Sequence, residues 1–66
     1  MALIAPERVL LTVEEAAAAL AIGRSKCYQI IAAKHLPIVH IGRSARVPAR
    51  AVSEFAERLA SGEIVI

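Results

Sequence analysis

Apolar residues recur with a helical period near the start of the chain. The positions Val13, Ala16, Ala17 and Leu20 follow the spacing i, i+3, i+4, i+7. Thr12 precedes them and Glu15 lies three residues further on, which is the arrangement of a capping box, in which each side chain accepts a hydrogen bond from the other residue's backbone amide. We therefore predict a helix that begins after Thr12 and ends near Leu20 or Ala21.

A second amphipathic stretch runs from Pro48 to Gly62. Pro suits the first turn of a helix and Gly suits its end. Its apolar positions again have the helical spacing: Val52, Phe55, Ala56 and Leu59. Arg50, Glu54 and Arg58 are spaced at i, i+4 and are expected on the outer face.

Between these two stretches, a third helix is predicted from about Arg24 to Lys34, ahead of Pro37. At about 100° per residue, one side carries Cys27, Ile30 and Ile31. The opposite side carries Ser25, Gln29 and Ala32, and the flanks carry Lys26, Tyr28 and Ala33. One side is therefore expected in the core, and the other, polar and without acids, could lie close to a groove.

The first and third predicted helices are separated only by Ala21-Ile22-Gly23. A connection this short forces two helices to cross at a steep angle, as in a helix-turn-helix. Ile22 is expected to fill the angle between them, and Gly23 to be the N-cap of the next helix.

From Ile38 the apolar period changes to two. The segments 38–41 and 45–47 flank Gly42-Arg43-Ser44, which predicts a β-hairpin. We expect Val39, Ile41 and Val47 to face the helices, and His40 and Arg46 to point outward. Residues 9–11 are either a short strand or an extended lead-in. The predicted fold class is mainly α with a small β-hairpin, a winged helix-turn-helix.

Charge is distributed unevenly. The net formal charge is only +2, but no Asp or Glu occurs between Glu15 and Glu54. That interval holds six basic residues: Arg24, Lys26, Lys34, Arg43, Arg46 and Arg50. Clustering of this kind is typical of proteins that approach phosphates, although six basic residues could also be ordinary solvated surface.

Length and composition favour a single domain over residues 1–66, with a core at about 11–60 and apolar tails at 1–10 and 63–66. One cysteine excludes an internal disulfide, and no stretch resembles a signal peptide or membrane span, so a cytoplasmic, nucleoid-associated protein is expected. The length leaves no room for an enclosed active site. His35 and His40 have no Cys or carboxylate nearby in sequence. We expect no enzymatic activity, cofactor or metal.

Three motifs together resemble the small winged-helix domains of phage excisionases and the related DNA-binding domains of MerR-type regulators. They are L-L-T-V-E-E-A-A at 10–17, R-S-x-x-Y at 24–28 and L-P-I-V-H-I-G-R-S-A-R-V-P at 36–48. The resemblance implies that the second helix enters the major groove and that the wing lies over phosphates or the minor groove. It also implies DNA contacts from Arg24, Ser25, Tyr28, Arg43 and Arg46. The chain departs from the family pattern at Ala21, Gly23, Gln29 and Ala45.

The candidate DNA-contacting residues are Arg24, Ser25, Lys26, Tyr28, Gln29, His40, Arg43, Ser44 and Arg46. Gln29 either pairs with adenine or is solvated. Tyr28 either donates its hydroxyl to a phosphate or packs beside the wing. Arg46 either contacts DNA or forms a salt bridge.

Three functions remain open. The first is an excisionase-like recombination directionality factor that binds and bends double-stranded DNA, in several copies, to direct an integrase toward excision. The second is a small MerR-like transcription regulator; no effector or coiled-coil segment follows the domain, which argues against a full MerR-type sensor. The third is a protein-interaction module such as an anti-repressor.

Overall fold

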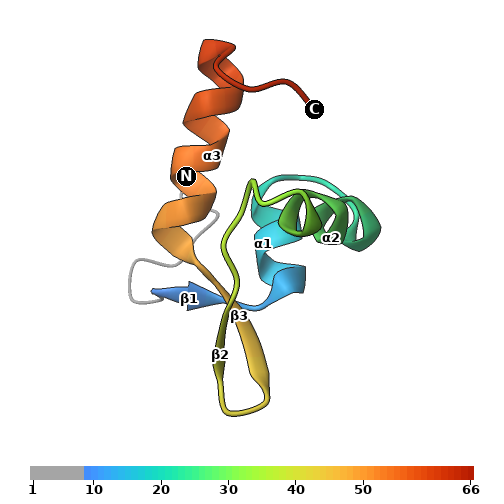
Figure 1. Cartoon of the computed structure of the whole chain (residues 1–66), viewed down its shortest axis with the longest axis vertical. Coiled ribbons are helices and arrows are strands. Elements are labelled where there is room, and N and C mark those ends of the chain that lie inside the picture. The colour runs from blue at the N-terminus through green and yellow to red at the C-terminus, as the bar shows by residue number, and fades with distance from the viewer. Residues whose placement is uncertain (1–8) are drawn as a thin grey trace.

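The computed structural model describes residues 9–66, in the order β1-α1-α2-β2-β3-α3 (Figure 1). The strands are β1 (Leu10–Leu11), β2 (Val39–Ile41) and β3 (Ser44–Pro48), and the helices are α1 (Val13–Ala19), α2 (Arg24–Ala32) and α3 (Ala49–Ser61). A helix-turn-helix, a hairpin and a last helix follow one another, which confirms the predicted winged helix-turn-helix. The part of the expected N-terminal tail before residue 9 lies outside the described residues.

The capping box that starts α1 is formed as predicted. The Glu15 amide donates to Thr12 Oγ1 at 3.0 Å, and the Thr12 amide donates to Glu15 Oε1 at 2.9 Å. Two backbone donors at the helix start are thereby satisfied, and the start of the helix-turn-helix is fixed.

Each helix is followed, one or two residues after its end, by a residue with left-handed backbone. These residues are Ala21 (φ 58°), Lys34 (φ 70°) and Gly62 (φ 79°). The residue after each donates its amide back to the last turn, to Ala17, Ile30 and Arg58 respectively, which is the Schellman pattern. Because Lys34 leaves the helical conformation, α2 ends at Ala32 and not at the predicted Lys34.

Ala21 is an unusual residue for this position, because the left-handed conformation costs a non-glycine residue about 1–2 kcal/mol. Its side chain is exposed, so Ala21→Gly removes no buried contact. We expect Ala21→Gly to raise the free energy of unfolding by about 1 kcal/mol, which for a domain of this size raises the Tm by about 4–8 °C. Thermal or denaturant unfolding followed by circular dichroism measures this.

Gly62→Ala is the matched control, because it places alanine in the same conformation at the end of α3. An added Cβ there meets nothing within 4 Å, so a loss of stability in this variant would report the backbone conformation alone. A lower Tm in Ala21→Gly than in the parent would contradict the strain at Ala21.

The three strands form an antiparallel sheet in the order β1-β3-β2. Leu11 pairs with Val47. Of the two alternatives predicted for residues 9–11, a short strand or an extended lead-in, the strand is the one that forms. In the hairpin, Ile41 pairs with Ser44, which leaves a turn of two residues, Gly42 and Arg43, in place of the predicted loop of three.

That difference in loop length reverses the faces of β2. Directly opposite residues share a face, and Val39 lies opposite Arg46, one residue away from the buried Val47. The prediction that Val39 and Ile41 face the helices is therefore wrong: they are 38% and 63% exposed. Val47 does face the core, as predicted, and is fully buried.

The core lies where α1, α2 and α3 meet the inner face of β3. Its buried residues are Leu11, Val13, Ala16, Ala17, Cys27, Ile30, Leu36, Val47, Ala49, Val52 and Phe55. On α3, Val52 and Phe55 are buried as predicted, whereas Ala56 and Leu59 are exposed, because α3 extends past the other helices (Figure 1).

Beyond α3 the chain turns back toward α2 (Figure 1). Ile64 packs against the core, whereas Val65 is 88% exposed. Within residues 9–66, none of the helices is long and apolar enough to cross a bilayer.

Candidate nucleic-acid interface

Helix α2 is fixed in its rotation by the side that it buries. Cys27 and Ile30 are buried, and the Cys27 Sγ lies 3.9 Å from the carbonyl oxygen of Val13, to which it donates. Burial raises the pKa of the thiol, so Cys27 stays neutral and acts as a small core residue at the crossing of α1 and α2. The opposite side of α2, with Ser25, Gln29 and Ala32, is exposed, as predicted.

The first residue of α2, Arg24, is held by an acid on α1. Arg24 Nη1 donates to Glu14 Oε2 at 3.0 Å across the turn, and both side chains are more than half exposed. The N-cap, Gly23, offers no side-chain hydrogen bond, and the first turn of α2 contains no acid. Glu14 thus brings a negative charge to a helix start that lacks its own.

The carboxylate of Glu14 is also affected by a charge on the wing, the hairpin formed by β2 and β3. Hydrogen bonds from its own backbone amide and from Arg24 hold the pKa of Glu14 below its ordinary value, and the positive charge of Arg46 on β3 acts in the same direction. In sequence, Glu14 lies in the first turn of α1, shortly after strand β1, which pairs with β3.

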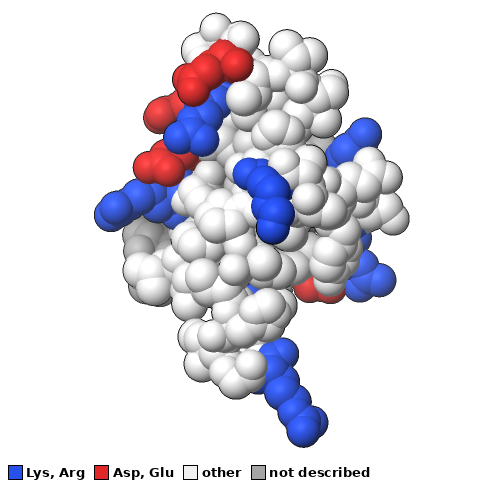
Figure 2. Space-filling model, viewed as in Figure 1, with Lys and Arg blue, Asp and Glu red and all other residues white. Residues whose placement is uncertain are grey.

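The wing presents its polar side chains near its end. His40, Arg43 and Ser44 are exposed, and Figure 2 shows a basic side chain projecting from the end of the hairpin. Of the two turn residues only Gly42 has a positive φ, 62°, which is the pattern of a type II′ turn. Arg46 is half-buried, and its Nη1 donates to the Ala45 carbonyl at 2.7 Å.

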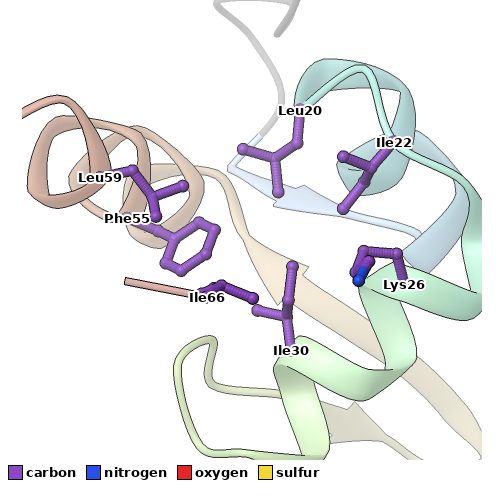
Figure 3. A pocket seen from close by; sticks show the side chains of 7 residues that line it. All are labelled: Leu20, Ile22, Lys26, Ile30, Phe55, Leu59 and Ile66. Carbon is purple, nitrogen blue, oxygen red and sulfur yellow. The ribbon is translucent and has the colours of Figure 1, made fainter. Parts of the chain in front are cut away.

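Lys26 is separated from the other candidates on α2. It borders an apolar groove of about 230 Å³ between the helix-turn-helix and α3 (Figure 3). The groove is lined by Leu20, Ile22, Lys26, Ile30, Phe55, Leu59 and Ile66. The exposed face of α2 therefore combines Arg24, Ser25, Tyr28 and Gln29, with Lys26 at its edge toward α3.

The acids lie mostly away from this face. Figure 2 shows them gathered over α3, which carries Glu54 and Glu57. Basic residues lie on α2 and the wing, and acids lie at the other end of the molecule. This charge distribution favours an approach to a polyanion in which α2 and the wing face it.

Comparison with known proteins shows the family to which the chain belongs. A family described as "Helix-turn-helix domain" matches residues 10–60. An excisionase from Streptomyces ambofaciens is 44% identical over 55 residues, which are 83% of this chain and 86% of that protein. The chain belongs to the excisionase family of helix-turn-helix proteins. No solved structure matches the chain significantly.

Another member of the excisionase family, a probable excisionase from Saccharopolyspora erythraea, is 50% identical over 54 residues. These residues are 82% of this chain but 55% of that protein, so the chain spans about half the length of this relative.

Two residues of the candidate interface of this excisionase-family chain could not be identified from the sequence. Ile41 is predicted to face the helices, yet it is exposed next to the turn that carries Arg43, and the two-residue length of that turn determines its face. Glu14 had no signal beyond its place in the first turn of α1, because its partner Arg24 lies ten residues away in sequence.

Potential metal ligands do not cluster in the described part of the chain, where His, Cys, Asp and Glu form no group of three or more. His35 instead packs against the Phe55 ring, with ring centroids 6.1 Å apart.

Proposed function

We propose that this chain binds double-stranded DNA sequence-specifically and acts as an excisionase, a recombination directionality factor without a catalytic step of its own. The observation that carries the proposal is the exposed, acid-free face of α2 beside a basic wing, on a chain whose relatives are named excisionases. Its place of action would be on DNA in the cytoplasm.

In this proposal α2 enters the major groove. Short side chains at Ser25 and Ala32 let its backbone approach the base edges, and Gln29 between them has the donor and acceptor needed to pair with adenine. Arg24 and Tyr28, at the side of this face, contact phosphates.

The wing would contact the adjacent minor groove. Arg43 at the turn supplies a cation, and Ile41 beside it supplies an exposed aliphatic side chain. Proteins that bend DNA often combine these two kinds of residue in the minor groove. His40, Ser44 and Arg46 would fix the position of the hairpin on the backbone.

Several copies would act side by side on DNA and present it to an integrase. One domain with one recognition helix and one wing covers only about 600–1,000 Å² of protein surface, so useful specificity favours neighbouring copies. The exposed Val65 offers an apolar contact for a neighbour, while Ile64 stays with its own core.

We expect cooperative binding to direct repeats, a complex whose gel mobility depends on the position of the sites, and an affinity that falls steeply with salt. The measurement is a gel shift on circularly permuted fragments at several salt concentrations, using repeats selected by the protein from random duplexes. Val65→Ser should weaken the cooperativity and leave binding to a single repeat unchanged.

A single repeat in the same set of fragments is the control for bending by one copy. Independent binding without any dependence on position would refute the architectural role and favour a small regulator. No preference among duplexes would refute DNA recognition and favour a protein-interaction module.

A further inference from the structure

Glu14 is an acid in a position where an acid is costly for a DNA-binding protein. Its side chain is 58% exposed and pairs with the first residue of the proposed recognition helix. The sequence between Glu15 and Glu54, which includes α2 and the hairpin, contains no acid that could oppose phosphates. A carboxylate beside DNA repels the phosphate backbone, so its presence at this point calls for a function that offsets the repulsion.

Fold stability does not provide that function. An ion pair between exposed side chains contributes little to folding, because water and salt screen it. The crossing of α1 and α2 is instead supported by buried residues, including Ala16, Ala17 and Cys27.

The geometry around Glu14 suits the positioning of Arg24. An unpaired arginine at the first turn of a helix is repelled by the positive end of the helix dipole and samples many rotamers. The bond of 3.0 Å from Nη1 to Glu14 Oε2 occupies one corner of the guanidinium and leaves its other donors available.

The same carboxylate lies within the influence of Arg46 on the wing, whose charge helps to hold the pKa of Glu14 below its ordinary value. The charge of Glu14 is thus favoured by basic residues on both α2 and β3.

We propose that Glu14 is a positioning residue for DNA recognition: from the first turn of α1, it holds Arg24 at the start of α2 in a fixed orientation. This inference rests on the proposed function. It implies that Glu14 lowers the affinity for any duplex by its charge but raises the preference for the cognate site, because an oriented guanidinium loses less freedom when it binds its own phosphate or base.

The test compares the affinities for two duplexes at one salt concentration: a site selected by the parent protein from random duplexes, and a scrambled duplex of the same length and composition. Glu14→Ala should lower the ratio of the two affinities by about three- to thirtyfold, which lies within the range expected for coupling between contacting residues. Glu14→Gln, which can still accept a bond from Arg24, should restore part of the ratio. In an Arg24→Ala background, Glu14→Ala should not change the ratio further.

Glu57→Ala is the matched control, because it removes the same charge from the exposed surface of α3. It should raise both affinities together and preserve their ratio. The same result for Glu14→Ala would overturn the positioning role and show that Glu14 only repels DNA. A lower Tm of Glu14→Ala without a change in the ratio of affinities would likewise overturn it and show that Glu14 serves the stability of the fold.

The outcome for the parent protein separates the two proposals. If the parent has no preference for any duplex, the proposed function fails. If the parent is specific and all Glu14 variants keep its ratio, only the positioning role fails.

Discussion

Phe55→Ala is expected to leave the chain largely unfolded. Phe55 is 2% exposed, is the only Phe in the sequence, and packs with the core and the His35 ring. Truncating a buried Phe to Ala costs about 3–5 kcal/mol, whereas the free energy of unfolding of a domain of this length is on the order of 3–10 kcal/mol. Denaturant unfolding measures the loss, and DNA binding should disappear with the folded population.

Leu59→Ala is the comparison on the same helix. Leu59 is 38% exposed, so its truncation should cost clearly less than that of Phe55. If Phe55→Ala showed a cooperative transition within a few degrees of the parent, α3 would not anchor the core.

Gln29→Ala is expected to relax the sequence preference at one base position, with a loss of about 1–3 kcal/mol on the cognate site. Gln29 is exposed at the centre of the free face of α2, opposite the buried Cys27 and Ile30. Binding to a panel of site variants measures the change. Unchanged base preferences would show that this face of α2 does not read the bases.

Arg43→Ala should act differently, because the minor groove that the wing contacts in the proposed arrangement distinguishes bases poorly, so that Arg43 supplies mainly charge. We expect it to weaken all sequences similarly and to reduce the salt slope by about one. Arg58→Ala on α3, whose side chain pairs with Glu63 at 3.8 Å, removes the same charge away from the interface and should leave the slope nearly unchanged. Equal effects of the two variants on the salt slope would show that the wing does not contact DNA.

The helices were predictable because their signals are local. Thr12 and Glu15 form the cap that their spacing indicates, and the apolar periods of α1 and α2 correctly place Ala16 and Ile30 in the core. The exposed face of α2 follows from the same period. The end of α2 was harder to predict, because Lys34 adopts a left-handed conformation in which glycine is the usual residue.

The contacts between elements were not predictable in the same way. Arg24 pairs with Glu14 because of the way α1 and α2 cross. The short turn in the sequence indicates that the helices cross, but it does not indicate which side chains then meet. The face of Val39 depends on whether the hairpin loop has two or three residues, and Gly42-Arg43-Ser44 is compatible with both.

The two-residue turn of the wing limits how this hairpin can change in length during evolution or design. If the turn keeps its two residues, one residue inserted between Gly42 and Arg43 shifts the pairing by one and exchanges the faces of β2, so that His40 takes the place of Ile41 opposite Ser44. One residue added to each strand at the turn would instead extend the hairpin and leave Val39 opposite Arg46. Functional relatives with longer wings are therefore expected to carry paired insertions, and a hairpin built to reach farther along a groove should be lengthened in both strands at once.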